Sequence, residues 1–173
     1  MANPPQHGPN SLRNYMAVHE TVMNQLRRSD FIREDTLALE EGEGFLRLGG
    51  HIACKGGIVI TVNKILEILE GEGEDAMVQT AKYSYHVQFR GGNSIFRYDN
   101  AHSWDGHADS HHKHLFDSNG VEEENSPIWV GEAAWPKLND VIHEVVDWYC
   151  DNMHNIADPD VFPDLNGLRD FTS

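Results

Sequence analysis

The chain has 173 residues, of which 13 are basic and 28 are acidic, and its formal net charge is −15. This length is typical of one domain around one hydrophobic core. A surplus of acid repels a polyphosphate backbone and favours a basic protein partner, unless a local basic groove or a bound cation screens the field. The same surplus would also simply keep the protein soluble.

Cysteine content and the first residues bear on location. Cys54 and Cys150 are the only cysteines, too few for a disulfide framework and too far apart for a zinc or redox motif. Residues 1–9 contain neither a basic stretch nor an apolar run, so we identify no signal peptide there. No window approaches the roughly 20 apolar residues that a membrane helix needs. We therefore expect a cytoplasmic protein without a membrane partner.

Residues 1–10 are punctuated by Pro and Gly and are predicted to be a flexible tail. Ser11 is the predicted N-cap of a first helix, which ends near Arg28. Apolar side chains recur in this helix at spacings of three and four residues. They are expected to face the core and are Leu12, Tyr15, Met16, Val22, Met23 and Leu26.

The middle of the chain is predicted to form an antiparallel meander of about four strands. Residues 45–53 and 58–62 flank a short glycine-containing connection, which is typical of a hairpin. The run 65–69 fits either a strand or a helix. Further on, apolar residues alternate strictly with polar ones, the period of a strand with one buried face, at Tyr83, Tyr85, Val87 and Phe89. The turn at residues 91–93 leads into a last strand at residues 94–99.

A second helix is predicted with Pro136 in its first turn and an end near Met153. Residues 157–173 combine Pro and Asp and are predicted to be a second tail. Residues 11–156 are thus expected to form a single α+β domain, in which an N-terminal and a C-terminal helix flank the meander.

A dense group of titratable side chains follows the last predicted strand. Five of the eleven histidines fall within thirteen residues, at His102, His107, His111, His112 and His114. They come directly after Arg97, Tyr98 and Asp99, and catalytic or binding residues often gather on loops that a rigid hairpin supports. We expect any functional site to lie in this long loop.

Two chemistries fit the loop. Because imidazole titrates near neutrality, two histidines can act as general acid and base on a phosphodiester. In this hypothesis the catalytic residues are Asp99, His102, His112 and His114. The residues that bind the phosphate or support the turn are Arg97, Tyr98 and Lys113. Alternatively, three side chains of the loop could hold Zn²⁺ or another divalent ion, although their spacing matches no standard zinc signature, and no cofactor is firmly predicted.

Explanations without a functional site also remain open for these residues. The histidines could simply be solvated, and the aspartate after the strand could simply form an Asx turn. The aromatic residues of the strand before the loop could stack bases, although core packing is the better explanation. The acidic runs 40–43 and 122–124 are predicted to be solvated loops that could dock a basic partner.

Residues 96–100 (Phe-Arg-Tyr-Asp-Asn) and 111–114 (His-His-Lys-His) resemble the TumE-like family of toxins from prokaryotic toxin-antitoxin modules. The resemblance covers about residues 45–149, and the segment 103–110 lies between the two motifs as an insertion. It implies a cytoplasmic toxin that is neutralised by an antitoxin, typically a basic helix-turn-helix protein, and it implies RNA as the natural substrate. The sequence therefore supports an RNA-directed toxin with ribonuclease activity, or a non-enzymatic regulatory domain whose loop binds a metal or a protein.

Overall fold

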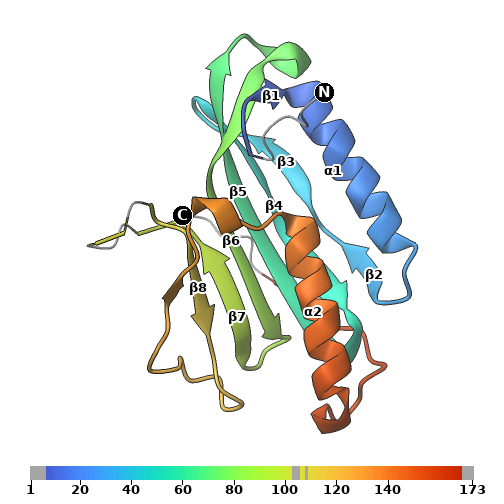
Figure 1. Cartoon of the computed structure of the whole chain (residues 1–173). Coiled ribbons are helices and arrows are strands. Elements are labelled where there is room, and N and C mark those ends of the chain that lie inside the picture. Colours follow the sequence, from blue (N-terminus) through green and yellow to red (C-terminus); the bar gives the residue numbers. More distant parts are fainter. Residues whose placement is uncertain (1–6, 103–105, 108, 169–173) are drawn as a thin grey trace.

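The computed structural model describes residues 7–102, 106–107 and 109–168. In this part of the chain, nine strands form one antiparallel sheet, and two helices lie on the same face of it (Figure 1). The expected α+β class is confirmed. The helices are α1 (Leu12–Arg27) and α2 (Leu138–Asn152). The strands are β1 (Asn10–Ser11), β2 (Ile32–Asp35), β3 (Ala38–Glu41), β4 (Phe45–Cys54), β5 (Ile58–Glu70), β6 (Met77–Phe89), β7 (Ser94–Asp99), β8 (His112–Leu115) and β9 (Ile128–Trp129).

The sheet is larger than the predicted meander of four strands. Its order is β2-β4-β5-β6-β7-β8-β9, with β3 also paired to β4 and β1 paired to β6. The predicted meander corresponds to its centre, β4 to β7. The strands that were missed have two to four residues, too few to display a period of two. One of them, β8, lies inside the segment that was predicted to be a loop, and that prediction was wrong there.

Both helices begin near their predicted starts. Ser11 is the N-cap of α1, and its hydroxyl accepts a hydrogen bond from the backbone N–H of Asn14 over 3.2 Å. The N-cap of α2 is Lys137, whose backbone N–H donates to the carboxylate of Asp140. Pro136 therefore precedes the N-cap instead of lying in the first turn. Neither helix of the described part is long and apolar enough to cross a membrane.

The long central strands explain the ambiguous run at residues 65–69. This run belongs to β5, which is paired on one side with β4 and on the other with β6. Hydrogen bonds to two neighbours fix the extended backbone whatever the local propensity. The tight connection from β4 to β5 contains Gly56 and Gly57, which have φ angles of 76° and 74°, a left-handed conformation that favours glycine.

The face of the sheet under the helices holds the main core. Tyr83, Tyr85 and Val87 of β6 are buried there, as their alternation predicted. Phe89 is partly buried and meets the Trp148 ring of α2 edge to face, with the ring centroids 5.9 Å apart. These aromatic residues therefore pack in the core, which argues against their use as an open base-stacking surface.

The opposite face, called the outer face below, is partly covered by the C-terminal segment. Leu165 packs on Ala53 and Val59 in a small buried cluster. The Arg90 guanidinium donates to the carbonyl oxygens of Asp164 and Asn166. The described residues after 156 form neither a helix nor a strand, but they contact the sheet. The domain boundary at 156 stays a prediction.

Candidate functional site

A row of polar side chains crosses the outer face of the sheet. In the strand register, His51 is opposite Thr61, Thr61 is opposite His86, His86 is opposite Arg97, and Arg97 is opposite His114. Residues that are directly opposite in an antiparallel sheet project from the same face. Period-two alternation therefore places side chains from five strands in one line.

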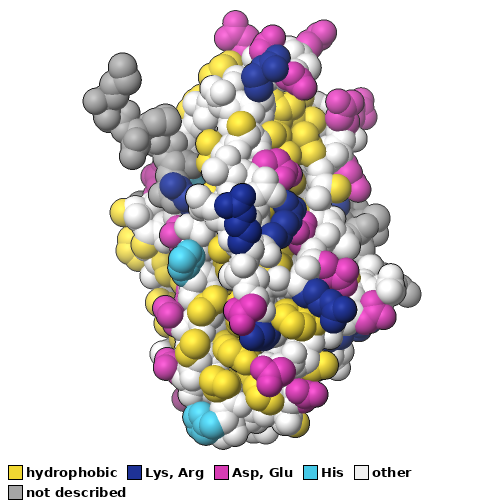
Figure 2. All heavy atoms as spheres, turned by 90° about the vertical axis from the view of Figure 1, so that its right-hand side faces the viewer, with side chains coloured by type: hydrophobic (Ala, Val, Ile, Leu, Met, Phe, Trp, Pro, Cys, Tyr) yellow, Lys and Arg dark blue, Asp and Glu magenta, His cyan; other side chains and the backbone are white. Residues whose placement is uncertain are grey.

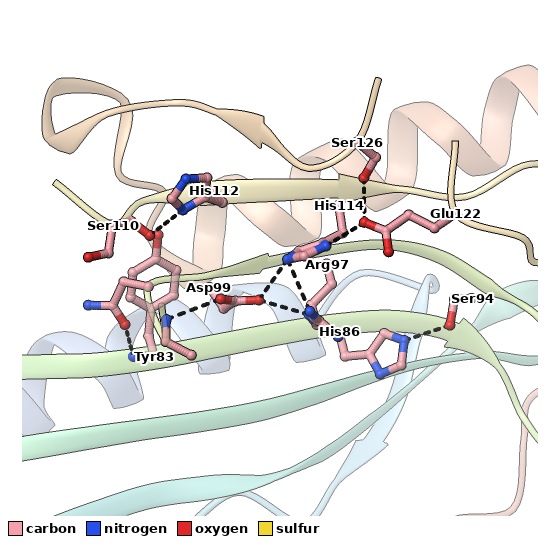
Figure 3. Close-up of polar contacts among 12 residues, drawn as sticks. Tyr83, His86, Ser94, Arg97, Asp99, Ser110, His112, His114, Glu122 and Ser126 are labelled. Atoms are coloured by element: carbon pink, nitrogen blue, oxygen red, sulfur yellow. Dashed lines mark hydrogen bonds and ion pairs between the residues drawn. The ribbon is translucent and has the colours of Figure 1, made fainter. Parts of the chain in front are cut away.

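The end of this row at β7 and β8 forms a bonded network (Figure 3). Arg97 Nε donates to Asp99 Oδ2 over 2.8 Å, and Arg97 Nη2 lies 3.0 Å from His114 Nε2. His114 Nδ1 lies 2.7 Å from Glu122 Oε1. The hydroxyl of Ser126 donates to the same Glu122 oxygen over 2.7 Å. We call these five residues the His114 network.

The network determines the tautomer of His114. A guanidinium can only donate, so Nε2 of His114 accepts from Arg97 and the ring proton resides on Nδ1. That proton is donated to Glu122, and this hydrogen bond is the main reason that the pKa of Glu122 is lowered. His114 therefore presents an oriented, unprotonated Nε2 beside a fixed positive charge.

The protonated form of His114 would also have a partner. Asp99 Oδ2 lies 3.3 Å from His114 Nε2, so a proton on Nε2 can be donated to this carboxylate. Asp99 is held in place by Arg97 and by the backbone N–H of Ala101. Both protonation states are thus accommodated, and such an arrangement suits a group that takes up and returns a proton.

Solvent reaches the network at its two ends. Asp99 and His114 are buried, whereas the side chains of Arg97 and Glu122 are 34% and 42% exposed. His86, next in the row, is half-buried, and its Nε2 lies 2.8 Å from the Ser94 hydroxyl. The guanidinium of Arg97 is thus the positively charged group of the network that solvent reaches.

Two predicted catalytic residues lie outside the network. His112 is opposite Asp99 on the outer face and is buried, and its Nδ1–H donates to the carbonyl of Ser110 over 2.6 Å. The ring of His107 stacks on His112 at 5.7 Å. His102 is exposed in the bend after β7, and no contact among the described residues joins it to the network.

Tyr98 and Lys113 lie on the opposite, helix-facing side of the sheet. They alternate with the network residues along β7 and β8, so their side chains project the other way. The hydroxyl of Tyr98 donates to Glu144 of α2 over 2.8 Å, and Lys113 forms an ion pair with the same carboxylate. Burial, followed by this hydrogen bond, raises the pKa of Tyr98. These two residues hold α2 on the sheet, so they do not join Arg97 at one phosphate site as expected.

The structure thus brings together three of the seven predicted site residues, namely Arg97, Asp99 and His114. It adds Glu122, which was expected in a solvated acidic loop. A bridge between Phe116 and Glu122 extends the pairing beyond β8, and the turn before it includes Gly120 at a φ of 75°. The sequence Asp-Ser-Asn-Gly at 117–120 is a turn signal that could have placed Glu122 across from the end of β8.

The metal alternative finds no ready ligand set. Among the residues that the structure describes, no group of three or more His, Cys, Asp or Glu side chains is arranged to hold a metal ion. The predicted loop residues at 103–105 and 108 lie outside the described residues.

A family model described as Toxin TumE matches residues 24–152, so the match begins inside α1, earlier than the expected 45–149, and ends with α2. No curated protein and no solved structure is significantly similar to the chain.

Proposed function

Because the chain belongs to the TumE family of toxins, we propose that it is a toxin that acts on RNA by general acid–base chemistry at His114. The proposal rests on the His114 network. The hydrogen bond from Arg97 keeps the lone pair of Nε2 unprotonated, and Nε2 can donate to Asp99 once it is protonated. Imidazole is the side chain best suited to this exchange near neutral pH.

Each group of the network has a role in this reaction. Arg97 binds the scissile phosphate through the donors that face solvent and stabilises the charge that develops on it. When Arg97 turns its Nη2 from His114 to the phosphate, the lone pair of Nε2 becomes available. His114 Nε2 then removes the proton of the attacking 2′-hydroxyl as that oxygen bonds to phosphorus, the bond between phosphorus and the 5′-oxygen breaks, and the imidazolium returns the proton to the leaving 5′-oxygen. Glu122 holds the ring through Nδ1, and Asp99 receives a hydrogen bond from the imidazolium.

Because the net charge of the chain is −15, we expect RNA to be attracted only by positive charge close to the site. Charges more than about 8 Å away are largely screened at physiological salt, so distant carboxylates do not prevent a phosphate from reaching Arg97. On the face that carries α1 and β2, basic side chains lie among acidic ones (Figure 2), for example where Arg27 pairs with Asp35. We therefore expect weak RNA binding with a shallow dependence on salt, because few phosphates are neutralised.

A toxin of this family implies an antitoxin partner. We propose that this partner is a basic helix-turn-helix protein, because electrostatic complementarity to a strongly acidic chain speeds encounter and rejects acidic competitors.

Replacement of His114 tests the proposal. In His114→Asn the side-chain amide can still donate to Glu122, but no titratable nitrogen faces Arg97. Cleavage of total RNA, and growth arrest on induction without antitoxin, should fall by about 10²- to 10⁴-fold. His154→Asn, at an exposed position after α2, is the matched control and should behave as wild type. Equal cleavage by His114→Asn and wild type, with both proteins folded, would refute the role of His114.

A non-enzymatic binding function is the second candidate. It is favoured by the internal pairing of the network, whose groups already have partners, as in a purely structural cluster. Untagged protein should be analysed for bound metal and then incubated with RNA in chelator. Intact RNA beside a stoichiometric metal, in a protein that still arrests growth, would favour this second function.

A further inference from the structure

A cavity of about 680 Å³ lies beside a gap in the sheet. The start of β6 pairs with β1 at residues 77–78, and its end pairs with β7 at residues 84–88. Between these segments neither strand pairs with β6. The cavity occupies this stretch, and its lining includes His7, Thr80, Asn100, His111, Glu132 and Trp135.

One wall of the cavity is an aromatic stack built on Trp135. The ring of His7 lies parallel to the indole, with centroids 3.9 Å apart and an interplanar angle of 3°. Tyr83 and His111 also contact the indole, at 5.4 and 4.4 Å, and the Tyr83 hydroxyl lies 3.1 Å from Nδ1 of His111. The stack is therefore fixed on the core side by β6.

His7 shows which ligand the wall accepts. Its Nε2 lies 3.1 Å from the carbonyl oxygen of Trp135, which can only accept, so Nε2–H is the donor. Burial lowers the pKa of His7 to about 4, and Lys64 and Lys137 contribute to this lowering. The wall thus holds a flat, neutral, nitrogen-containing ring that stacks and donates one N–H, in a place where nearby cations disfavour positive charge.

Nucleobases share each of these properties. They are flat and neutral, they stack on aromatic side chains, and their edges donate and accept hydrogen bonds. Glu132 lines the same cavity and could accept a hydrogen bond from a base edge. Asn100 forms another part of the lining, and its side-chain amide is held by the N–H of Tyr83 and the carbonyl of Ala81. The indole Nε1 of Trp135 is buried without a hydrogen-bond partner in the described structure, so the arrangement with His7 leaves one donor of the wall unsatisfied.

We propose that this cavity binds the base of a nucleotide, with Trp135 as the stacking surface and His7 as an internal placeholder that the base displaces. The proposal rests on the proposed action on RNA, to which it adds a base-binding site. Asn100 directly follows Asp99, and His111 directly precedes His112. The cavity lining thus begins near the ends of β7 and β8. Tyr83 and His111 place it on the helix-facing side of the sheet, whereas the His114 network lies on the outer face.

Binding is measured in the His114→Asn background, so that RNA is not cleaved. Anisotropy of a short fluorescein-labelled single-stranded RNA reports affinity, and quenching of tryptophan fluorescence reports stacking on an indole. His7→Ala should tighten RNA binding by about 5- to 10-fold, because the base no longer competes with an attached ring. Quenching should disappear in Trp135→Phe, which keeps a ring in the wall, and should persist in the control Trp148→Phe.

Adenosine monophosphate distinguishes the two sources of a base. If adenosine monophosphate by itself quenches the fluorescence of Trp135, the site binds free nucleotides. If the RNA quenches it and the mononucleotide does not, the site binds a base within a strand. Absence of quenching by either ligand, or quenching that survives Trp135→Phe, overturns the base site. RNA cleavage is measured separately from quenching, so each proposal can fail alone. Cleavage by wild type without quenching refutes only the base site. Quenching without cleavage by wild type refutes only the nuclease activity.

Discussion

His86, in the middle of the polar row, should make the stability of the protein depend on pH. Burial of the ring, followed by the charge of Arg97, lowers the pKa of His86 from 6.5 to about 4. Between these two pH values the unfolded chain binds a proton at His86 that the folded chain does not bind. Stability contributed by the neutral ring is therefore complete above about pH 6.5 and is lost as the pH falls towards 4.

The magnitude follows from the two pKa values. A fall from 6.5 to about 4 corresponds to about 3 kcal/mol of unfolding free energy. Because the ring is only half-buried and solvent screens part of the effect, we expect about 2 kcal/mol. This loss is large beside the roughly 5–15 kcal/mol by which domains are stable.

Urea unfolding of wild type and His86→Gln measures this contribution. Glutamine can still donate to Ser94 but does not titrate. The stability difference between the two proteins at about pH 7 should shrink or reverse by about 2 kcal/mol at about pH 4.5. The pKa of His7 is lowered as well, but His7 is present in both proteins, so its contribution cancels. Parallel stability curves for the two proteins over this range would refute the reasoning.

Two further expectations concern packing under α2. Glu144→Ala should cost about 3 kcal/mol in urea unfolding, because it leaves the ammonium of Lys113 without its carboxylate. Glu144→Gln keeps the size of the side chain but removes its charge, and a cost below about 1 kcal/mol for this variant would show that the charge is immaterial. Phe89→Ala should cost about 3 kcal/mol, because the contact of this ring with Trp148 and the core is lost. Thermal unfolding measures this cost, and a loss below about 1 kcal/mol would mean that the ring is effectively solvated.

Elements with a strong hydrophobic period could be predicted from the sequence. The alternation at Tyr83, Tyr85 and Val87 indicated a strand with one buried face, and those side chains are buried. The N-cap at Ser11 was recognised because a hydroxyl there has a specific local partner, the N–H of Asn14. In both cases the determinant lies within a few residues of the element.

The strand β8 could not be predicted in this way, because its alternation contains no apolar contrast. His112 and His114 project from the outer face, and Lys113 projects towards α2. A strand with polar residues on both faces resembles a loop in any hydrophobic pattern. Hydrogen bonding to β7 is what makes β8 a strand. The register of this pairing also determines which of the predicted residues lie on the same face.

For the same reason, only some contacts of the His114 network could be expected from the sequence. Arg97 and Asp99 are two residues apart, so a strand at this position must place them on one face. Glu122 is paired with His114 only through the turn after β8, a contact across eight residues without a local signal in either side chain. Tyr98 and Lys113 project towards α2 instead, because residues that are neighbours in the sequence of a strand point to opposite faces.

The connection between β7 and β8 has a consequence for how the protein can vary. Twelve residues join Asp99 to His112, yet Arg97 and His114 are held opposite each other by the strand ladder. The entropic cost of closing such a connection grows only with the logarithm of its length, by about 0.6 kcal/mol for each doubling. Insertions or deletions in the middle of the connection should therefore be nearly neutral for folding and should leave the Arg97–His114 geometry unchanged. Related chains can differ widely in length here without altering the chemistry of the network, so the connection is a natural place for substrate or partner preference to diverge.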